Sequence, residues 1–373
     1  MNILIACDKF KGSLSALEAS DAIKKGVNKI LPNSNVTILP LADGGEGSLE
    51  VIEKKLNFKR ILCSSKDPLL RSVNSWYGLQ GKTAYIEMAI SFGLQLLKEN
   101  EKNALLSSSI GTGELILDAL EKGARKIYLF VGGSATSDAG IGMAYALGYR
   151  FINKDNQELT PNGESLRHIT SIGGKPHKDI NRTDFYLISD VNNPLFGSKG
   201  AAKMFAKQKG ASSDDIKTLE KGFKNFNEIV KTTYNIDINA KEGAGAAGGL
   251  GAGAMVFLKA KKKNGINSIM DILNFDNYVD KSDIVISGEG KFDNQTLNGK
   301  VINGVIEKCI KNNKPLGIVC GIMELSIKET KKLPIKAIEP IVDKQTSKEA
   351  AMNNAYELLT QRSATLIEKM IAD

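Results

Sequence analysis

Residues 1–13 read MNILIACDKFKGS, and residues 283–293 read DIVISGEGKFD. Each stretch contains a short apolar run rich in β-branched residues and then changes abruptly to charged residues and glycine. Such a run is typical of a parallel strand that is buried on both faces. Three more runs share the pattern, at residues 36–41, 316–320 and 337–341. Because helical patterns separate the runs, the sequence predicts a doubly wound parallel α/β sheet.

Two capping boxes mark helix starts in this pattern. Ser15-x-x-Glu18 follows the first strand, and Thr346-x-x-Glu349 precedes the last helical stretch. In such a box each of the two side chains accepts a hydrogen bond from a backbone N–H group that the helix itself leaves unpaired. We therefore expect one helix after the first strand and one C-terminal helix that runs from Thr346 through Leu366.

The middle of the chain has a different pattern. It is richer in glycine, and it contains paired strand candidates at residues 73–77 and 84–88 that resemble a hairpin. The simplest arrangement is a split domain with an insertion. The prediction is a discontinuous domain of residues 1–62 plus 284–373, with an α/β domain of residues 63–283 inserted into it.

Inside the insertion the pattern alternates between helix and strand. A helix at residues 114–122 should lead to a strand at 127–131 and, after a glycine-rich loop, to a helix at 139–147. This is the layout of a phosphate-binding loop between a strand and a helix. A further strand at residues 185–189 ends at Asp190, and a long helix is expected at 214–231.

Composition excludes several classes of protein. The 373 residues are 42% hydrophobic and 25% charged, which is ordinary globular usage. The net charge of +8 is spread along the chain apart from a short basic run at residues 259–263, so we expect a solvated surface and no nucleic-acid partner. No apolar stretch is long enough to span a membrane, and the N-terminus lacks a signal-peptide pattern.

The number and spacing of the cysteines and histidines argue against several kinds of site. The four cysteines are far apart and form no C-x-x-C pair, which argues against a zinc site and against a disulfide framework. A reducing cytoplasm is therefore the expected location. The two histidines, His168 and His177, lie in polar, loop-like stretches, so a histidine base or a histidine-rich metal site is not expected.

Three loops that follow predicted strands are rich in acids, lysines and glycine. Open α/β sheets bind ligands beyond the carboxyl ends of their strands, so these loops should meet at one edge. A single aspartate there is more often a turn or cap residue, but three such loops favour phosphoryl transfer, in which acids hold Mg²⁺ or accept a proton and lysines neutralise phosphate. The candidates are Asp8, Lys9 and Lys11, then Asp43, Gly44, Gly45 and Glu46, then Glu289, Lys291 and Asp293.

The insertion contains two glycine-rich segments. The segment GGSATSDAG begins at Gly132, and its small residues would let backbone N–H groups approach an anion, although a tightly packed turn explains them equally well. Residues 243–253 read GAGAAGGLGAG and contain a literal G-x-G-x-x-G. A dinucleotide fingerprint needs a strand just before it, and the preceding residues are polar, so close helix packing or an anion loop fits as well. No Walker A and no protein-kinase motif occurs.

Together these segments resemble the bacterial type-I glycerate kinases over essentially the whole chain. The resemblance implies ATP-dependent phosphorylation of D-glycerate, in most relatives at the 2-hydroxyl, with 3-phosphoglycerate as the alternative product. It also implies a Rossmann-like α/β domain with a second α/β domain inserted. The resembling segments are DKFKGSLSALEA from Asp8, PLADGGEGS from Pro40, YIEMA from Tyr85, GTGELI from Gly111, GGSATSDAG from Gly132, DVNNPLFG from Asp190, QKGA from Gln208, GAGAAGGLGAG from Gly243, and SGEGKFDNQT with GKV from Ser287.

We expect Mg²⁺·ATP and glycerate to bind in a cleft between the two domains. In this hypothesis the acids serve as base or Mg²⁺ ligands, the lysines contact phosphate oxygens, and the glycine-rich loops bind the nucleotide. The catalytic candidates are Asp190, Asp293, Lys11 and Lys291, and the Mg²⁺ candidates are Asp190, Glu289 and Asp293. The glycerate candidates are Asp8, Lys9, Asp43, Gly44, Gly45 and Glu46. The nucleotide candidates are Gly132, Gly133, Ser134, Thr136, Asp138, Gly245, Gly248 and Gly249.

Two other functions are compatible with parts of the sequence. An NAD-dependent hydroxy-acid dehydrogenase would explain the G-x-G-x-x-G segment, and it would bind NADH in place of ATP. A non-enzymatic metabolite-binding regulator would need a ligand cleft but no set of catalytic acids. The number of acids at predicted strand ends argues against the regulator.

Overall fold

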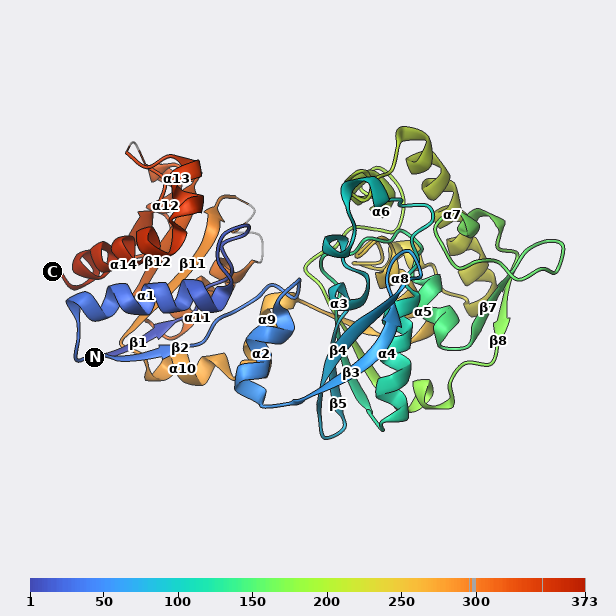
Figure 1. The fold of residues 1–373 in the computed structure, drawn as a ribbon, viewed down its shortest axis with the longest axis horizontal. Coiled ribbons are helices and arrows are strands. Elements are labelled where there is room, and N and C mark those ends of the chain that lie inside the picture. The colour runs from blue at the N-terminus through green and yellow to red at the C-terminus, as the bar shows by residue number, and fades with distance from the viewer. Residues whose placement is uncertain (295, 297–299, 344, 373) are drawn as a thin grey trace. The chain divides into compact units, whose positions relative to one another are not determined.

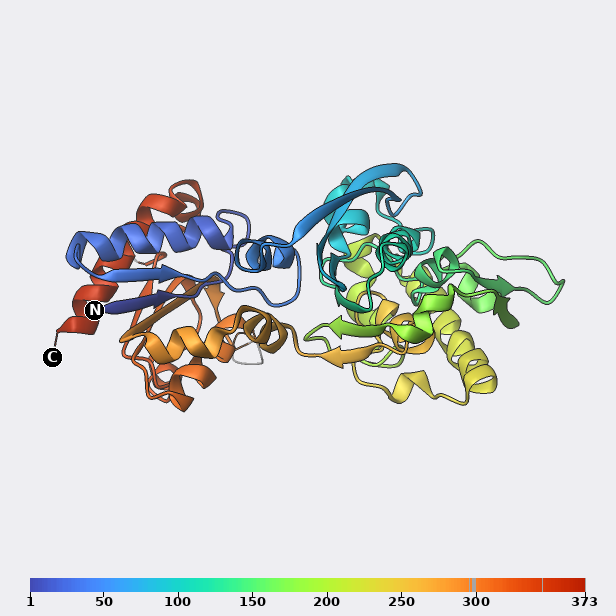
Figure 2. The same cartoon turned by 90° about the horizontal axis from the view of Figure 1, so that it is seen from below.

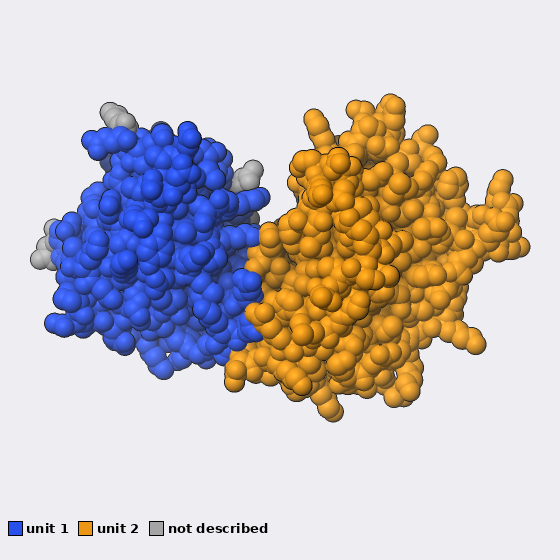
Figure 3. Space-filling view, in the orientation of Figure 1, with its two compact units in different colours: residues 1–43, 50–55, 265–373 blue, residues 44–49, 56–264 orange. Residues whose placement is uncertain are grey.

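The structure, a computed structural model, describes residues 1–294, 296, 300–343 and 345–372. They form two compact units (Figure 3). Unit 1 contains residues 1–43, 50–55 and 265–373, and unit 2 contains residues 44–49 and 56–264. The fold class is therefore the predicted one, an α/β sheet domain with a second α/β domain inserted into it.

Unit 1 is built on a parallel five-stranded sheet with the strand order β13-β12-β11-β1-β2 (Figure 1). Numbered along the sequence of this unit, that order is 2-1-3-4-5 read from the other edge, which is a doubly wound arrangement. All five predicted strands are confirmed. Their bounds are β1 (Asn2–Ile5), β2 (Asn35–Ile38), β11 (Ile284–Phe292), β12 (Leu316–Met323) and β13 (Ala337–Pro340).

β11 is longer than the sequence predicted. Its pairing with β12 continues to Lys291 opposite Ile322 and Phe292 opposite Met323. Glu289 and Lys291 were expected in a loop, and the structure corrects this because both belong to the strand. The charges and glycines of this segment end the apolar pattern but do not end the hydrogen-bonded ladder.

Helices cover both faces of the unit 1 sheet. α1 (Ala16–Ile30) packs against α14 (Ala355–Ile371) on one face, while α10 contacts β1 and α11 contacts β11. Figure 2 shows α1 in blue on one side of these strands and the orange helices on the other. The remaining helices of the unit are α9 (Gly265–Leu273), α10 (Phe275–Lys281), α11 (Val301–Lys311), α12 (Ile327–Thr330) and α13 (Lys348–Asn353).

Of the two predicted capping boxes, only the first is present. The Ser15 side chain accepts a hydrogen bond from the Glu18 backbone N–H at 3.2 Å, and the Glu18 carboxylate accepts from the Ser15 N–H at 2.9 Å. At the C-terminal end the prediction was wrong. Ser347, and not Thr346, caps α13, and the helical stretch breaks at Asn354 before α14 begins.

The second boundary between the units falls at residues 264 and 265, whereas the sequence pattern placed it at 283 and 284. α9 and α10 lie between these positions and belong to unit 1. A Cβ atom at Gly304 of α11 would lie 2.8 Å from Cγ1 of Ile266 in α9, so the two helices are closely packed. The strand pattern that set the predicted boundary contains no information about helices that precede the strand.

Unit 2 contains a mixed six-stranded sheet with the order β10-β9-β6-β5-β4-β3. β3, β4 and β5 pair antiparallel, which confirms the predicted hairpin, and β5, β6, β9 and β10 are parallel. A second, two-stranded sheet pairs β7 with β8. The strands are β3 (Lys59–Lys66), β4 (Ser72–Gln80), β5 (Thr83–Glu87), β6 (Lys126–Phe130), β7 (Tyr149–Ile152), β8 (Ser171–Gly174), β9 (Asp184–Ile188) and β10 (Lys261–Lys263).

The predicted helices of the insertion are also present, within a few residues of their expected bounds. They correspond to α4, α5 and α7. The helices of this region are α2 (Ser48–Leu56), α3 (Ala89–Phe92), α4 (Ile110–Glu121), α5 (Ile141–Ala146), α6 (Ala201–Phe205), α7 (Ser213–Tyr234) and α8 (Leu250–Phe257). Within the described part of the chain, no helix is both long and apolar enough to cross a membrane.

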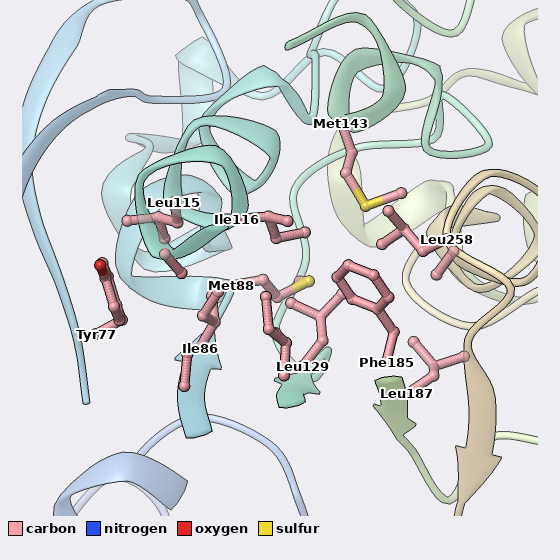
Figure 4. Packing of buried hydrophobic residues seen from close by; sticks show 14 of the residues in the cluster. Tyr77, Ile86, Met88, Leu115, Ile116, Leu129, Met143, Phe185, Leu187 and Leu258 are labelled. Carbon is pink, nitrogen blue, oxygen red and sulfur yellow. The ribbon is translucent and has the colours of Figure 1, made fainter. Parts of the chain in front are cut away.

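The core of unit 2 lies between the large sheet and α4, α5 and α8. Figure 4 shows Leu115 and Ile116 of α4 over Ile86 and Leu129 of the sheet, all fully or almost fully buried. Burying such a side chain stabilises the fold by about 1.5–3 kcal/mol. Because these strands and helices pack as one cluster, the loops at the carboxyl ends of β5, β6 and β9 are held on a rigid base.

The contact between α1 and α14 yields a stability prediction. A Cβ atom at Gly26 would lie 2.3 Å from the Thr360 carbonyl oxygen and 2.7 Å from Cβ of Ser363. Gly26→Ala should therefore lower the free energy of unfolding by about 2 kcal/mol through overpacking, although alanine favours a helix by about 1 kcal/mol. Thermal unfolding measures this. Asn28→Ala, at an exposed position of the same helix, is the control, and equal melting temperatures for the two variants would contradict the close approach.

Candidate active site

The carboxyl edge of the unit 1 sheet contains a switch point between β1 and β11. The chain continues from β1 to β2 on one side and from β11 to β12 on the other, and ligands of open α/β sheets bind where the order reverses in this way. The backbone N–H of Asp8 donates to the Gly288 carbonyl oxygen at 2.9 Å. Asp8, three residues after β1, and Glu289 of β11, two predicted site residues, therefore lie close to each other at the switch point.

The acids at this edge act on one another. Burial, and after it the charge of Asp43, raises the pKa of Asp8 to about 7. Burial also raises the pKa of Glu289 to about 7, while a hydrogen bond from Thr296 lowers it. Closely spaced carboxylates with raised pKa values are typical of functional sites. This edge thus brings together largely buried carboxyl groups, and a bound cation would favour their charged form.

Thr296 links two of the predicted acids. Its hydroxyl group donates to Oε1 of Glu289, and the Asp293 backbone N–H donates to the Thr296 hydroxyl oxygen at 3.2 Å. The Thr296 N–H donates in turn to Oδ1 of Asp293 at 3.1 Å. Sequence reasoning assigned Thr296 no role, although it belongs to the SGEGKFDNQT segment. Gln295 of that segment and Gly299 of the following GKV lie outside the described residues.

The predicted lysines differ in their surroundings. Lys291 is half-exposed, and its Nζ lies 2.8 Å from Oε2 of Glu324 and 3.2 Å from Oδ2 of Asp293. The hydrogen bonds with Glu324 and then Asp293 raise the pKa of Lys291 and keep it charged. Lys11 is exposed and lines a cavity of about 80 Å³ together with Lys348. Glu324 and Lys348 were not predicted, because neither belongs to the strand-end loops that were inspected.

Unit 2 presents a second set of residues at the carboxyl ends of β5, β6, β9 and β10. Asp190 follows β9, and the side-chain amide of Asn264, which follows β10, donates to Oδ1 of Asp190 at 2.5 Å. This contact orients one of the predicted catalytic acids. Asn264 was missed, since a lone asparagine after a basic run gives no sequence signal.

Glu87 anchors part of the predicted glycerate loop to unit 2. This buried carboxylate accepts from the backbone N–H groups of Gly47 at 2.9 Å and Leu49 at 3.0 Å. A Cβ atom at Gly132 would lie 2.4 Å from Cα of Gly45, so the loop also packs closely against the segment after β6. The predicted glycerate residues are therefore divided, with Gly44, Gly45 and Glu46 in unit 2 and Asp8, Lys9 and Asp43 in unit 1.

The first part of the predicted phosphate loop after β6 is hydrogen-bonded to residues 92–94. The Leu94 N–H donates to the Gly133 carbonyl oxygen at 2.9 Å, and the Ala135 N–H donates to the Phe92 carbonyl oxygen at 3.2 Å. Gly133 has a φ of 78° and is exposed. In the described part of the chain no acceptor pairs with the N–H groups of Gly132 and Gly133. These donors are free to bind an anion.

The carboxylate of Asp138 accepts hydrogen bonds from neighbouring residues of the protein. The side chain is fully buried, and burial raises its pKa. Its carboxylate accepts from the Ser109 N–H at 2.8 Å, the Ser109 hydroxyl at 2.7 Å, the Gly140 N–H at 3.0 Å and the Gly142 N–H at 3.2 Å. These contacts tie the start of α4 to the start of α5. Any influence of Asp138 on a nucleotide would therefore act through the loop that it holds.

The second glycine-rich segment packs against the first. A Cβ atom at Gly248 would lie 1.9 Å from the Thr136 carbonyl oxygen, and one at Gly245 would lie 2.3 Å from the Pro194 carbonyl oxygen. Gly249 has a φ of 87° and packs against Ala139. A short 3₁₀ helix, Ile238–Ala240, and not a strand, precedes this segment. The structural context of a dinucleotide fingerprint is absent from it.

Lys209 is a further residue that sequence reasoning missed. It is 1% exposed, and its Nζ donates to Ser134 Oγ at 2.7 Å and to the Thr136 carbonyl oxygen at 2.6 Å. Burial lowers the pKa of Lys209 to about 7. A buried lysine within QKGA has no periodic pattern that would distinguish it from the exposed lysines around it.

Comparison with known proteins assigns this α/β chain to a class of enzymes, the kinases. A family model, the glycerate kinase family, matches residues 3–371, and the chain belongs to this family of kinases. A glycerate kinase from Halalkalibacterium halodurans is 37% identical over 98% of this chain and 97% of its own length. The glycerate 2-kinase of Escherichia coli (strain K12) is 36% identical over 98% and 97%. A crystal structure from Salmonella typhimurium LT2 that bears the provisional name glycerate kinase 2 has a TM-score of 0.86 at 34% identity, covering 100% of this chain and 98% of that one.

The raised pKa of Asp8 predicts how stability depends on pH. Burial and Asp43 raise this pKa from 3.8 to about 7 in the folded protein, so the neutral carboxyl group is the form that folding favours. The contribution of Asp8 to the free energy of unfolding should therefore fall as pH rises from about 4 to about 7. Asp8→Asn, which resembles the neutral form, should be more stable than the parent at pH 8 by on the order of 1 kcal/mol.

Urea unfolding at pH 5 and pH 8 measures this difference. Asp271→Asn, at an exposed position of unit 1, is the matched control and should leave the pH profile as in the parent. An Asp8→Asn variant that is less stable than the parent at pH 8 would contradict the crowding of carboxylates at this edge.

Proposed function

We propose that this chain transfers the terminal phosphoryl group of ATP to the 2-hydroxyl group of D-glycerate, giving ADP and 2-phosphoglycerate. The observation that supports it most strongly is the match to the glycerate kinase family over residues 3–371. The position of transfer is supported by the Escherichia coli relative, which is named glycerate 2-kinase. Transfer to the 3-hydroxyl group is the alternative.

In this proposal the ATP phosphates bind at the loop after β6. Its support is the pair of unpaired N–H groups at Gly132 and Gly133, among the described residues, next to the Ser134 hydroxyl. Preorganised donors of this kind stabilise charge on a transferring phosphoryl group without rearranging. Thr136, Asp138, Gly245, Gly248 and Gly249 would act by holding the loop in place.

The acids of unit 1 fit a bound Mg²⁺ ion. No group of three acidic, histidine or cysteine side chains among the described residues forms a complete metal site. A kinase Mg²⁺ ion, however, is usually bound by one or two carboxylates together with water and substrate phosphates. Burial, and for Asp8 also the charge of Asp43, raises the pKa values of Asp8 and Glu289, and a bound cation would favour the charged form of both carboxylates. Glu289 and Asp293, which Thr296 connects, would hold the ion, and the ion would neutralise charge on the phosphate oxygens.

The other roles follow from the contacts of each residue. Asp190, oriented by Asn264, is the proposed acceptor of the glycerate hydroxyl proton. Lys291, kept charged by Glu324 and Asp293, and the exposed Lys11 would contact phosphate oxygens. Asp8, Lys9, Asp43 and the Gly44–Gly45–Glu46 segment remain the proposed glycerate contacts. That the two domains form one cleft around the substrates stays a prediction.

Family membership favours the kinase over the two other functions considered. The dehydrogenase hypothesis rested on residues 243–253, where glycines pack against the loop after β6 and a 3₁₀ helix stands in place of the required strand. The regulator hypothesis required a site without catalytic acids, whereas both strand edges contain them. Binding of ATP without turnover of any hydroxy acid would instead support the hypothesis of a non-enzymatic regulator.

Product identity tests the position of transfer. Purified protein with ATP, MgCl₂ and D-glycerate should yield a phosphate ester whose phosphorus resonance matches authentic 2-phosphoglycerate and which enolase dehydrates directly. A product that enolase consumes only after phosphoglycerate mutase is added would be 3-phosphoglycerate. That result would contradict the 2-kinase assignment but not the kinase assignment.

Substitution of the acids tests the mechanism. Asp190→Asn and Asp293→Asn keep the shape of the side chains but remove their charge. We expect kcat to fall about a hundredfold or more, the scale of losing a positioned acid or base. Asp184→Asn, an exposed position at the start of β9, is the control and should keep the parent rate. Variants at 190 and 293 that melt normally and turn over glycerate at the parent rate would refute both roles.

A further inference from the structure

Lys209 occupies an unusual position for a lysine. It ends the short 3₁₀ helix Lys207–Lys209, where Lys207 and Gln208 are exposed, yet its own side chain is 1% exposed. A Cβ atom at Gly248 would lie 2.9 Å from its Nζ, so the space around the amine depends on glycine at that position. The amine thus lies between the loop after β6 and the second glycine-rich segment.

The charge of this lysine has no counter-ion within the described part of the chain. Its two acceptors, Ser134 Oγ and the Thr136 carbonyl oxygen, are neutral. Asp138 is the titratable group whose charge acts on Lys209, but four donors already occupy that carboxylate. Burying an ammonium group without a paired anion is costly, and here burial lowers its pKa to about 7. An anion bound beside this loop would offset that cost.

The direction of the hydrogen bond from Lys209 to Ser134 determines what the Ser134 hydroxyl proton can do. In its charged form, which a bound anion would favour, the ammonium group of Lys209 can only donate, so Ser134 Oγ then accepts from it. A hydroxyl group has one proton, and no described residue accepts that of Ser134. The Thr136 hydroxyl, fully buried, also has no hydrogen-bond partner in the described part of the chain. The loop therefore has donors in excess, and Ser134, which is itself 6% exposed, directly follows the exposed Gly133.

We propose that Lys209 is a positioning residue of the phosphate loop: its buried ammonium group commits Ser134 Oγ to accept, so that the Ser134 hydroxyl proton donates to a phosphate oxygen of the nucleotide. The inference rests on the proposed function, and it adds to it a residue that does not touch the substrate. Lys209 acts on the phosphate through Ser134 and through its charge, while Ser134 makes the contact. If this is so, the loop should also bind an inorganic triphosphate that carries no nucleoside.

A double-mutant cycle tests the coupling. Ser134→Ala and Lys209→Met should each raise the KM for ATP about tenfold, the loss of one hydrogen bond to a charged group, and leave the KM for glycerate near that of the parent. Because both act on the same contact, the double variant should be little worse than Lys209→Met alone. Lys207→Met, an exposed lysine of the same 3₁₀ helix, is the matched control and should behave as the parent.

Two results would overturn the proposal. One is additivity of the two substitutions, and the other is a Lys209→Met variant that melts lower but keeps the parent KM for ATP. If Lys209→Met does not fold, calorimetric titration of parent and Ser134→Ala with tripolyphosphate decides, because equal affinities would exclude Ser134 as a donor. A parent that binds tripolyphosphate but never phosphorylates glycerate would refute the proposed function and leave the role of Lys209 standing.

Discussion

The pairing of β1 with β11 is the interaction on which the rest of this structure depends. It joins Ile3 to Ile284 in register and is extended by the hydrogen bond from the Asp8 N–H to the Gly288 carbonyl oxygen. Two adjacent parallel strands must be joined by a crossover connection. Between β1 and β11 this connection is long enough to contain a separate folded unit, and most of the chain between β2 and α9 forms unit 2. The same pairing sets the switch point and brings Asp8, which follows β1, close to Glu289 of β11. Domain insertion and the acidic edge thus have one structural cause.

In unit 2 the corresponding constraint is close approach of backbones. Glycine at 132 allows contact with Gly45, and glycine at 248 allows contact with the Thr136 carbonyl oxygen. Side chains that are buried below these contacts, Glu87, Asp138 and Lys209, use their polar atoms to hold loops and helix starts in place. A kinase stabilises its transition state mainly by position and charge, so rigidity at such a loop is a functional property. The apolar core shown in Figure 4 supplies the base for it.

The strands and most helices could be predicted from sequence because buried parallel strands and amphipathic helices have periodic signals. The hairpin of β4 and β5 and the capping box at Ser15 were recognised for the same reason. The incorrect predictions and the site residues that were not predicted concern features that have no local signal in the sequence. Glu289 and Lys291 are polar and were therefore expected in a loop. They belong to a strand because they pair with β12, which the local sequence does not indicate. The C-terminal helical stretch begins one residue later than predicted, so Ser347 is the cap in place of Thr346. Lys209 resembles the many surface lysines in sequence, and only tertiary packing makes it a buried cation.

In the proposed function, the chain binds the phosphates of ATP at the loop after β6 and transfers the terminal phosphoryl group to glycerate. A crystal structure with MgCl₂, D-glycerate and a non-hydrolysable ATP analogue tests it most directly. Phosphate oxygens should lie within hydrogen-bond distance of the Gly132 and Gly133 N–H groups and of the Ser134 hydroxyl. Phosphates bound wholly at the edge of the unit 1 sheet, with no contact to residues 132–138, would contradict it.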